Sequence, residues 1–191
     1  MKARKIVLAI AVLTLAFGGV AYADTVTQKL RVLVNKKWEA GSEAVVADGK
    51  TYISSQVVSD KLHAIVLRED GRVSVFRPNV HMVTSSGSTI FADVKKGDVK
   101  FNTFIQVDSL KTDISELKLT IANPYGDETL LDQRKTGDAD FPDGKNDFWI
   151  TKADITYKFD KVGPYTIRFA VKPAGESSFQ VISEKTINSK D

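Results

Sequence analysis

The chain has 191 residues, no cysteine, and 27 lysine and arginine residues against 24 aspartate and glutamate residues. Without cysteine, disulfides, thiol nucleophiles and thiolate metal sites are excluded. The formal net charge is only +3 and the basic residues form no cluster in the sequence, so we expect no binding to nucleic acid.

Residues 1–23 have the layout of a secretory signal peptide. Lys2, Arg4 and Lys5 give a basic start, Ile6 to Phe17 form an apolar stretch, and a small-x-small tripeptide ends at Ala23. We expect cleavage after Ala23 and a secreted, extracellular protein, either free or associated with the cell wall.

An uncleaved membrane anchor is the alternative for this segment. The apolar stretch is shorter than the roughly 20 residues of a typical span, and Gly18 and Gly19 interrupt it. No second apolar segment follows, so no membrane span is expected after cleavage. Because the signal peptide holds three basic residues and no acidic one, its removal leaves equal numbers of acidic and basic residues.

The first half of the mature chain is predicted to contain short strands around one helix. Lys29–Val34 alternates polar and apolar residues as a strand does, and Asp48-Gly49 is a strong hairpin turn. A serine pair at residues 54–55 can cap a helix that ends at about Leu62. A second hairpin follows, with its turn at residues 69–71.

In this order, the segments VLVNKK, TYIS and AIVLREDGRVSVF resemble the copper amine oxidase N-terminal-like domain over about residues 29–83. The resemblance implies a small α+β domain of layout ββαββ, here residues 24–83, common in exported proteins of Gram-positive bacteria. It implies no catalysis, because in the oxidases this domain is an accessory stalk and the copper site needs three histidines. This chain has only His63 and His81, which we expect to be turn or surface residues.

Residues 84–89 are small, polar and without periodicity, which predicts a linker or a long turn between two domains. Over residues 90–191, short strands are separated by polar turns. Alternation is clear in Leu117–Ala122 and in Ile155–Phe159. Evenly spaced short strands of this kind predict an antiparallel sandwich.

The stretch YKFDKVGPYTIRFAV resembles the F-x-x-x-G-x-Y corner of bacterial immunoglobulin-like domains, with Phe159, Gly163 and Tyr165 in the matching places. The resemblance implies that the tyrosine bonds back across the corner. It also implies that residues 90–191 are an antiparallel immunoglobulin-like β-sandwich, so that the whole protein is mainly β.

Between two predicted strands, the stretch GDADFPDGKND runs from Gly137 to Asp147. Its spacing excludes an EF-hand, because proline holds position 5 of the loop, where an oxygen ligand is needed, and glycine comes one place after position 6. An irregular calcium loop remains an alternative, since Ca²⁺ accepts oxygen ligands in flexible geometry. Its ligands would be Asp138, Asp140, Asp143 and Asp147. A plain turn of the form x-P-D-G-x explains the same residues and is the favoured reading, and no other cofactor is expected.

Other residues give weak indications of a site. Four aromatic residues are candidates for an exposed platform that binds sugars or peptides: Trp38, Tyr52, Tyr125 and Trp149. Their neighbours at period two favour core packing for most of them instead. Glu39 and Glu43 are a pair of acids of the kind a glycosidase needs, but acids are common in this chain. No nucleophile elbow supports a Ser-His-Asp arrangement, so no enzyme is predicted.

We therefore expect a secreted, non-enzymatic binding or structural protein of the bacterial cell envelope. Its partner would be a cell-wall polymer or another envelope protein. The alternative is an exported enzyme, or an accessory subunit of an extracellular hydrolase or oxidase. A deep pocket with converging carboxylates would favour the enzyme, whereas an open face with exposed aromatic residues would favour binding.

Overall fold

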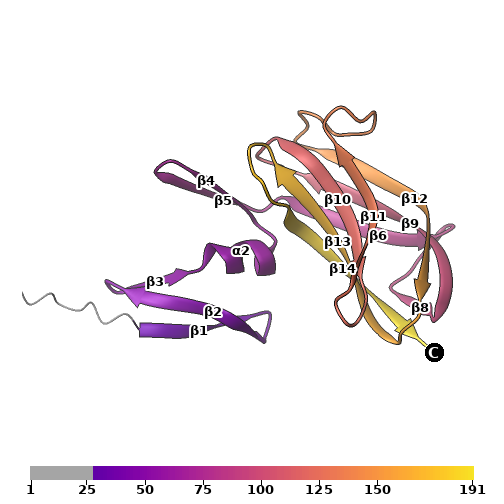
Figure 1. The fold of residues 1–191 in the computed structure, drawn as a ribbon, viewed down its shortest axis with the longest axis horizontal. Helices are drawn as coiled ribbons and strands as arrows, with labels where there is room; N and C mark the ends of the chain where they lie inside the picture. Colours follow the sequence, from indigo (N-terminus) through magenta and orange to yellow (C-terminus); the bar gives the residue numbers. More distant parts are fainter. Residues whose placement is uncertain (1–27) are drawn as a thin grey trace, which may run out of the picture. The chain divides into compact units, whose positions relative to one another are not determined.

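The computed structural model describes residues 28–191 and is mainly β, as predicted. The predicted signal peptide and its cleavage site lie outside the described residues. The chain divides into two compact units, of which the first ends at Ile53 and the second comprises Ser54–Asp191. Figure 1 shows the strands of both units.

The first unit, where it is described, is an antiparallel sheet of three strands in chain order: β1 (Gln28–Val34), β2 (Lys37–Ala47) and β3 (Lys50–Ile53). The predicted turn between β2 and β3 is confirmed, with φ of 50° at Asp48 and 72° at Gly49. Asn35 and Lys36, with φ of 49° and 64°, turn the chain from β1 into β2. Both pairs have the positive φ that two-residue hairpin turns require.

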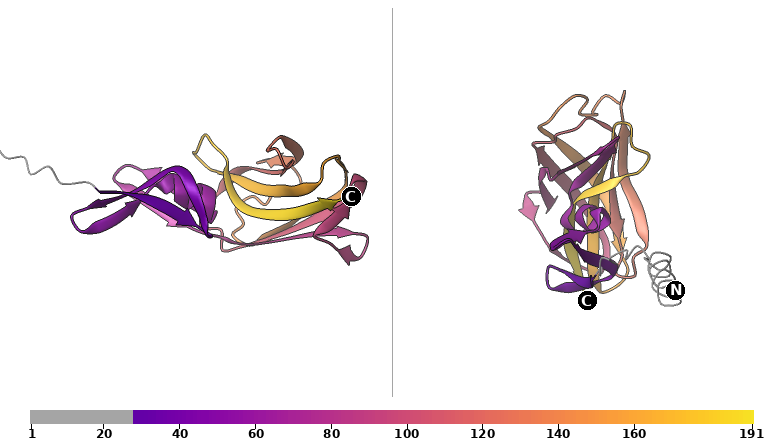
Figure 2. Two further views of the ribbon diagram at one scale, coloured as in Figure 1. Left: turned by 90° about the horizontal axis from the view of Figure 1, so that it is seen from below. Right: turned by 90° about the vertical axis from the view of Figure 1, so that its left-hand side faces the viewer.

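Two facing sheets form most of the second unit, as Figures 1 and 2 show. The first sheet has the order β11-β10-β13-β14-β8. Its strands are β8 (Asp93–Lys95), β10 (Ile114–Ala122), β11 (Glu128–Lys135), β13 (Gly163–Pro173) and β14 (Gln180–Lys190). The second sheet has the order β12-β9-β6-β7. Its strands are β6 (Asn79–Ser86), β7 (Thr89–Ile90), β9 (Gly97–Asp108) and β12 (Phe148–Phe159).

The hydrophobic core of the second unit contains residues from both sheets. Alternate residues of each strand point inward, so that Phe101 of β9, Leu119 of β10 and Phe169 of β13 are almost fully buried. Each side chain of this size contributes about 1.5–3 kcal/mol relative to an exposed position. The core therefore accounts for the sandwich-like packing without any disulfide.

The predicted corner before β13 is present. The hydroxyl of Tyr165, which is fully buried, accepts the backbone N–H of Lys161 at 3.0 Å. Burial raises the pKa of Tyr165. Gly163 has φ of 132°, and a Cβ there would lie 3.2 Å from Cγ of Pro124. The glycine is needed because a side chain would be strained by its backbone and crowded by the proline ring.

The helix and the second hairpin belong to the second unit. The helix α2 (Ser55–Leu62) is capped by the hydroxyl of Ser54, which accepts the N–H of Gln56 at 3.2 Å. It is followed by the hairpin of β4 (Ile65–Glu69) and β5 (Arg72–Phe76). The side-chain amide of Gln180 in β14 bonds both the N–H of Val66 (2.8 Å) and its carbonyl oxygen (3.0 Å). The elements predicted as one ββαββ domain are thus divided between the two units. Three strands, β1 to β3, end at Ile53 in the first unit, and α2, β4 and β5 belong to the second.

Of residues 84–89, which were expected to form a linker or a long turn, 84–86 belong to β6 and Thr89 to β7, so that only Gly87 and Ser88 form a turn. Thr84 is fully buried in β6 and donates its hydroxyl to the carbonyl of Phe91 at 2.7 Å. Ser85 pairs with Asn102 of β9 on one side and with Ile90 of β7 on the other. Small polar residues are compatible with such a strand, because pairing satisfies the backbone groups whatever the side chain. The division between compact units therefore falls after Ile53.

Candidate functional site

The aspartate-rich loop connects β11 to β12 and is fixed at several points. The predicted turn is present, since the N–H of Lys145 donates to the carbonyl of Pro142 at 3.2 Å and Gly144 has φ of 64°. Phe141 is buried and packs in the core. The N–H of Leu110, on the β9–β10 connection, donates to the carbonyl of Asn146 at 2.9 Å. The loop is therefore built around backbone hydrogen bonds and one core anchor.

The four aspartates of this loop do not share a common partner. The carboxylate of Asp138 accepts the N–H of Lys135 at 2.8 Å, and that of Asp147 accepts the N–H of Ser109 at 2.7 Å. Asp140 and Asp143 are exposed. Within residues 28–191, no three histidine, aspartate or glutamate side chains are grouped so that they could hold a metal ion. The structure thus does not gather the four into a calcium loop.

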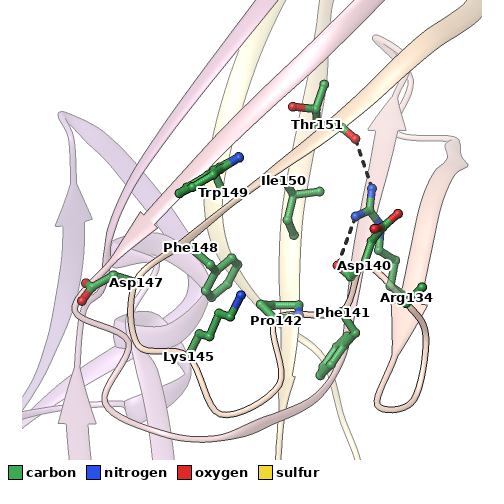
Figure 3. A pocket seen from close by; sticks show the side chains of 11 residues that line it. Arg134, Asp140, Phe141, Pro142, Lys145, Asp147, Phe148, Trp149, Ile150 and Thr151 are labelled. Atoms are coloured by element: carbon green, nitrogen blue, oxygen red, sulfur yellow. Dashed lines mark hydrogen bonds between the residues drawn. The ribbon is translucent and has the colours of Figure 1, made fainter.

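A hollow of about 460 Å³ lies beside this loop, as Figure 3 shows. Arg134 on one side donates to the carbonyl oxygens of Asp140 (3.3 Å) and Thr151 (3.1 Å). Asp140 and Asp147 stand at opposite ends of the hollow in Figure 3. General acid–base catalysis on one bond needs groups that converge on it. This hollow therefore does not offer a pair of catalytic carboxylates.

The solvent-exposed side of the second sheet is a second candidate site. Phe148 and Ile150 of β12 and Ile105 of β9 are buried, so the residues that alternate with them point away from the core. Six such residues form two rows across β12, β9 and β6, and we call them the outer face: Trp149, Gln106 and His81 in one row, Thr151, Phe104 and Val83 in the other. Residues in a row are direct cross-strand neighbours, about 5 Å apart at Cβ.

The outer face combines aromatic and uncharged polar groups. The side chains of Trp149 and Phe104 are 73% and 40% exposed. The side-chain amide of Gln106 donates to both carboxylate oxygens of Asp108 at 3.1 Å, which leaves its carbonyl oxygen as an acceptor. None of the six residues carries a carboxylate, an ammonium or a guanidinium group.

The solvent side of the first sheet of the second unit carries several ion pairs. Lys172 lies 2.8 Å from Glu116, and hydrogen bonds from Lys172 and then Gln133 hold the pKa of Glu116 below its usual value. Burial would lower the pKa of Arg168, but its hydrogen bonds to Glu184 and Glu128 outweigh burial and raise it. The second sheet carries ion pairs too, such as Lys100 of β9 with Asp154 of β12 at 2.9 Å, but these lie outside the six positions of the outer face.

The expectation that most of the four aromatic candidates pack in a core is wrong. Trp38, Tyr52, Tyr125 and Trp149 are 59%, 54%, 75% and 73% exposed. The four are divided between the two compact units. Trp38 and Tyr52 belong to the first compact unit, where the guanidinium of Arg31 lies 4.5 Å from the ring centre of Trp38. Tyr125 and Trp149 lie beyond opposite ends of β11.

The remaining candidates are dispersed. His63 ends α2 with φ of 55°, and its Nε2 lies 3.8 Å from Glu184, while His81 is part of the outer face. Glu39 and Glu43 are both on β2. Sequence reasoning missed Phe104 and Gln106, although alternation within β9 places them beside each other on one side of that strand. Their alignment with Trp149 depends on the strand register, which the sequence does not state.

Comparisons with known proteins identify no family for this chain. No protein-family model matches it, and no curated protein matches it. In the part of the chain that the structure describes, no helix has the length and apolar composition needed to cross a membrane.

Proposed function

We propose that this chain is a secreted, non-enzymatic binding protein of the bacterial cell envelope. Its partner is a cell-wall polymer or another envelope protein. The observation that carries this proposal is the outer face, where aromatic and uncharged polar side chains stand exposed on paired strands. Exposed aromatic residues on a rigid scaffold are typical of recognition surfaces.

Further support comes from the sequence and from the hollow beside the β11–β12 loop. The first 23 residues have the layout of an export signal, and the resemblances to an oxidase stalk and to an immunoglobulin-like domain both imply accessory modules. In the hollow beside the β11–β12 loop, Asp140 and Asp147 lie at opposite ends. Binding without turnover is consistent with these features.

A retention assay tests this function. The mature protein, expected to begin at Asp24 by intact mass, is incubated with cell-envelope fractions at low and high salt. Retention should be only weakly salt-dependent, because the mature chain has equal numbers of acidic and basic residues. A parallel screen for hydrolase and amine oxidase activity should be negative. Failure of retention on every fraction, or turnover that one carboxylate substitution abolishes, would contradict the proposal.

A further inference from the structure

The outer face has the chemistry of a surface for uncharged, hydroxyl-rich ligands. A sugar ring presents C–H groups that pack on an aromatic ring and hydroxyls that bond to amides, imidazoles and other hydroxyls. Trp149 and Phe104 supply the rings, and Gln106 and His81 supply hydrogen-bonding groups beside them. We propose that this face binds a neutral glycan chain, an inference that rests on the binding function proposed above.

The absence of formal charge within the six positions favours an uncharged ligand. Charged residues make up 27% of the chain, yet the six positions of the outer face contain none. The nearest carboxylate along β9, Asp108, already accepts the amide of Gln106. The six positions themselves offer a phosphodiester polymer or an acidic peptide no ionic partner for the water it would lose. The cations nearby are Lys145, which lines the hollow with Trp149, and Lys100, which already pairs with Asp154 at 2.9 Å. A neutral glycan needs no such partner.

The face is also held in place before any ligand arrives. The central strand β9 is paired on both sides, with β12 and with β6. Trp149 follows directly on the loop that Phe141 anchors in the core. The bond to Asp108 fixes the direction of the Gln106 amide. Since ordering side chains on binding costs free energy, a preorganised face binds more tightly than a mobile one of the same composition.

The inference is tested by calorimetric titration of the mature protein. The probes are the β-1,4-linked hexamers of glucose and of N-acetylglucosamine, the neutral polysaccharide fraction of the envelope, and an anionic teichoic acid. We expect binding to at least one neutral probe, with an affinity that salt does not change, and no preference for the teichoic acid. Trp149→Ala should weaken that binding by about tenfold or more, as loss of a central aromatic contact does.

Tyr125→Ala is the matched control, because Tyr125 is as exposed as Trp149 and lies beyond the other end of β11. It should leave the affinity unchanged. Both substitutions are at exposed positions, so both variants should unfold at the temperature of the parent protein. Phe104→Ala with Trp149→Ala should abolish binding, and Gln106→Ala should weaken it while the fold remains intact.

Several outcomes would overturn the inference. No binding to any neutral probe would do so, as would equal binding by the parent and by Trp149→Ala. Salt-sensitive binding of the teichoic acid alone would point to a charged surface elsewhere. If the protein self-associates through Trp149 and binds no neutral probe, the outer face binds a second copy of this chain instead of a glycan. Retention of both the parent and Trp149→Ala on envelope fractions would leave the proposed function standing and remove only the glycan face.

Discussion

At the scale of single residues, Tyr165 is the position where one hydroxyl group matters most. It is fully buried and accepts the N–H of Lys161, so Tyr165→Phe leaves that donor without its partner. We expect the free energy of unfolding to fall by about 1–3 kcal/mol, measured by denaturant titration. Tyr125→Phe removes an exposed hydroxyl and should have no measurable effect. Equal effects of the two changes would show that the corner bond contributes nothing.

The sequence predicted this corner but not the exposure of the aromatic residues, for one physical reason. Phe159, Gly163 and Tyr165 are close in the chain, so their contact is local. Whether Trp149 points inward or outward depends on the register of β12 against β9, which pairs residues more than forty positions apart. A shift of one residue would turn each side chain to the opposite side. Local patterns determine turns and corners, and distant pairing determines which face is exposed.

At the scale of elements, the ion pairs of the first sheet make its stability depend on pH. Hydrogen bonds from Lys172 and Gln133 lower the pKa of Glu116 in the folded state. A lowered pKa adds stability above the unfolded value of about 4.3, and this contribution is lost as the pH falls through the folded value. Glu116→Gln should therefore lower the melting temperature slightly at pH 7 and have no effect at pH 2.

Glu176→Gln is the control, because Glu176 lies in the β13–β14 turn and forms no ion pair among residues 28–191. It should change the melting temperature little at either pH. A difference between Glu116→Gln and the parent that persists unchanged at pH 2 would contradict the assignment to this pair. Alternation predicted a strand that begins at Leu117, next to Glu116, but not the pairing that places Glu116 beside Lys172 across β10 and β13.

At the scale of the whole molecule, the boundary between the two compact units can be tested with two fragments. Residues 54–191 retain β6, whereas residues 90–191 begin inside β7 and lack it. Without β6, one side of β9 loses its partner, and Val80 and Met82 no longer pack against the core. We expect 54–191 to unfold cooperatively and 90–191 to aggregate or stay unfolded, as measured by circular dichroism.

The opposite result, a stable 90–191 fragment, would support the linker predicted from residues 84–89. That prediction rested on small polar residues, which are common in linkers and equally compatible with a strand that is paired on both sides. The mainly β character of the protein could be predicted from the alternation of residues and from the turns. The position of the division could not be predicted, because it depends on the packing of Ile65, Leu67 and Phe76 of the β4–β5 hairpin on the core of the second unit.

The bonds of Arg134 have a consequence for contacts between molecules. The strands β11 and β12 are the outermost strands of their sheets, and an outermost strand exposes backbone groups with which a strand of another molecule can pair. The guanidinium of Arg134 already occupies the carbonyl of Thr151 on β12. A few residues further on, the irregular pairing between Lys152 and Ile155, with φ of 56° at Asp154, interrupts the ladder. A strand of another molecule that approached this edge would therefore meet an occupied acceptor and then a bent backbone, which disfavours fibril-like association through this side of the sandwich.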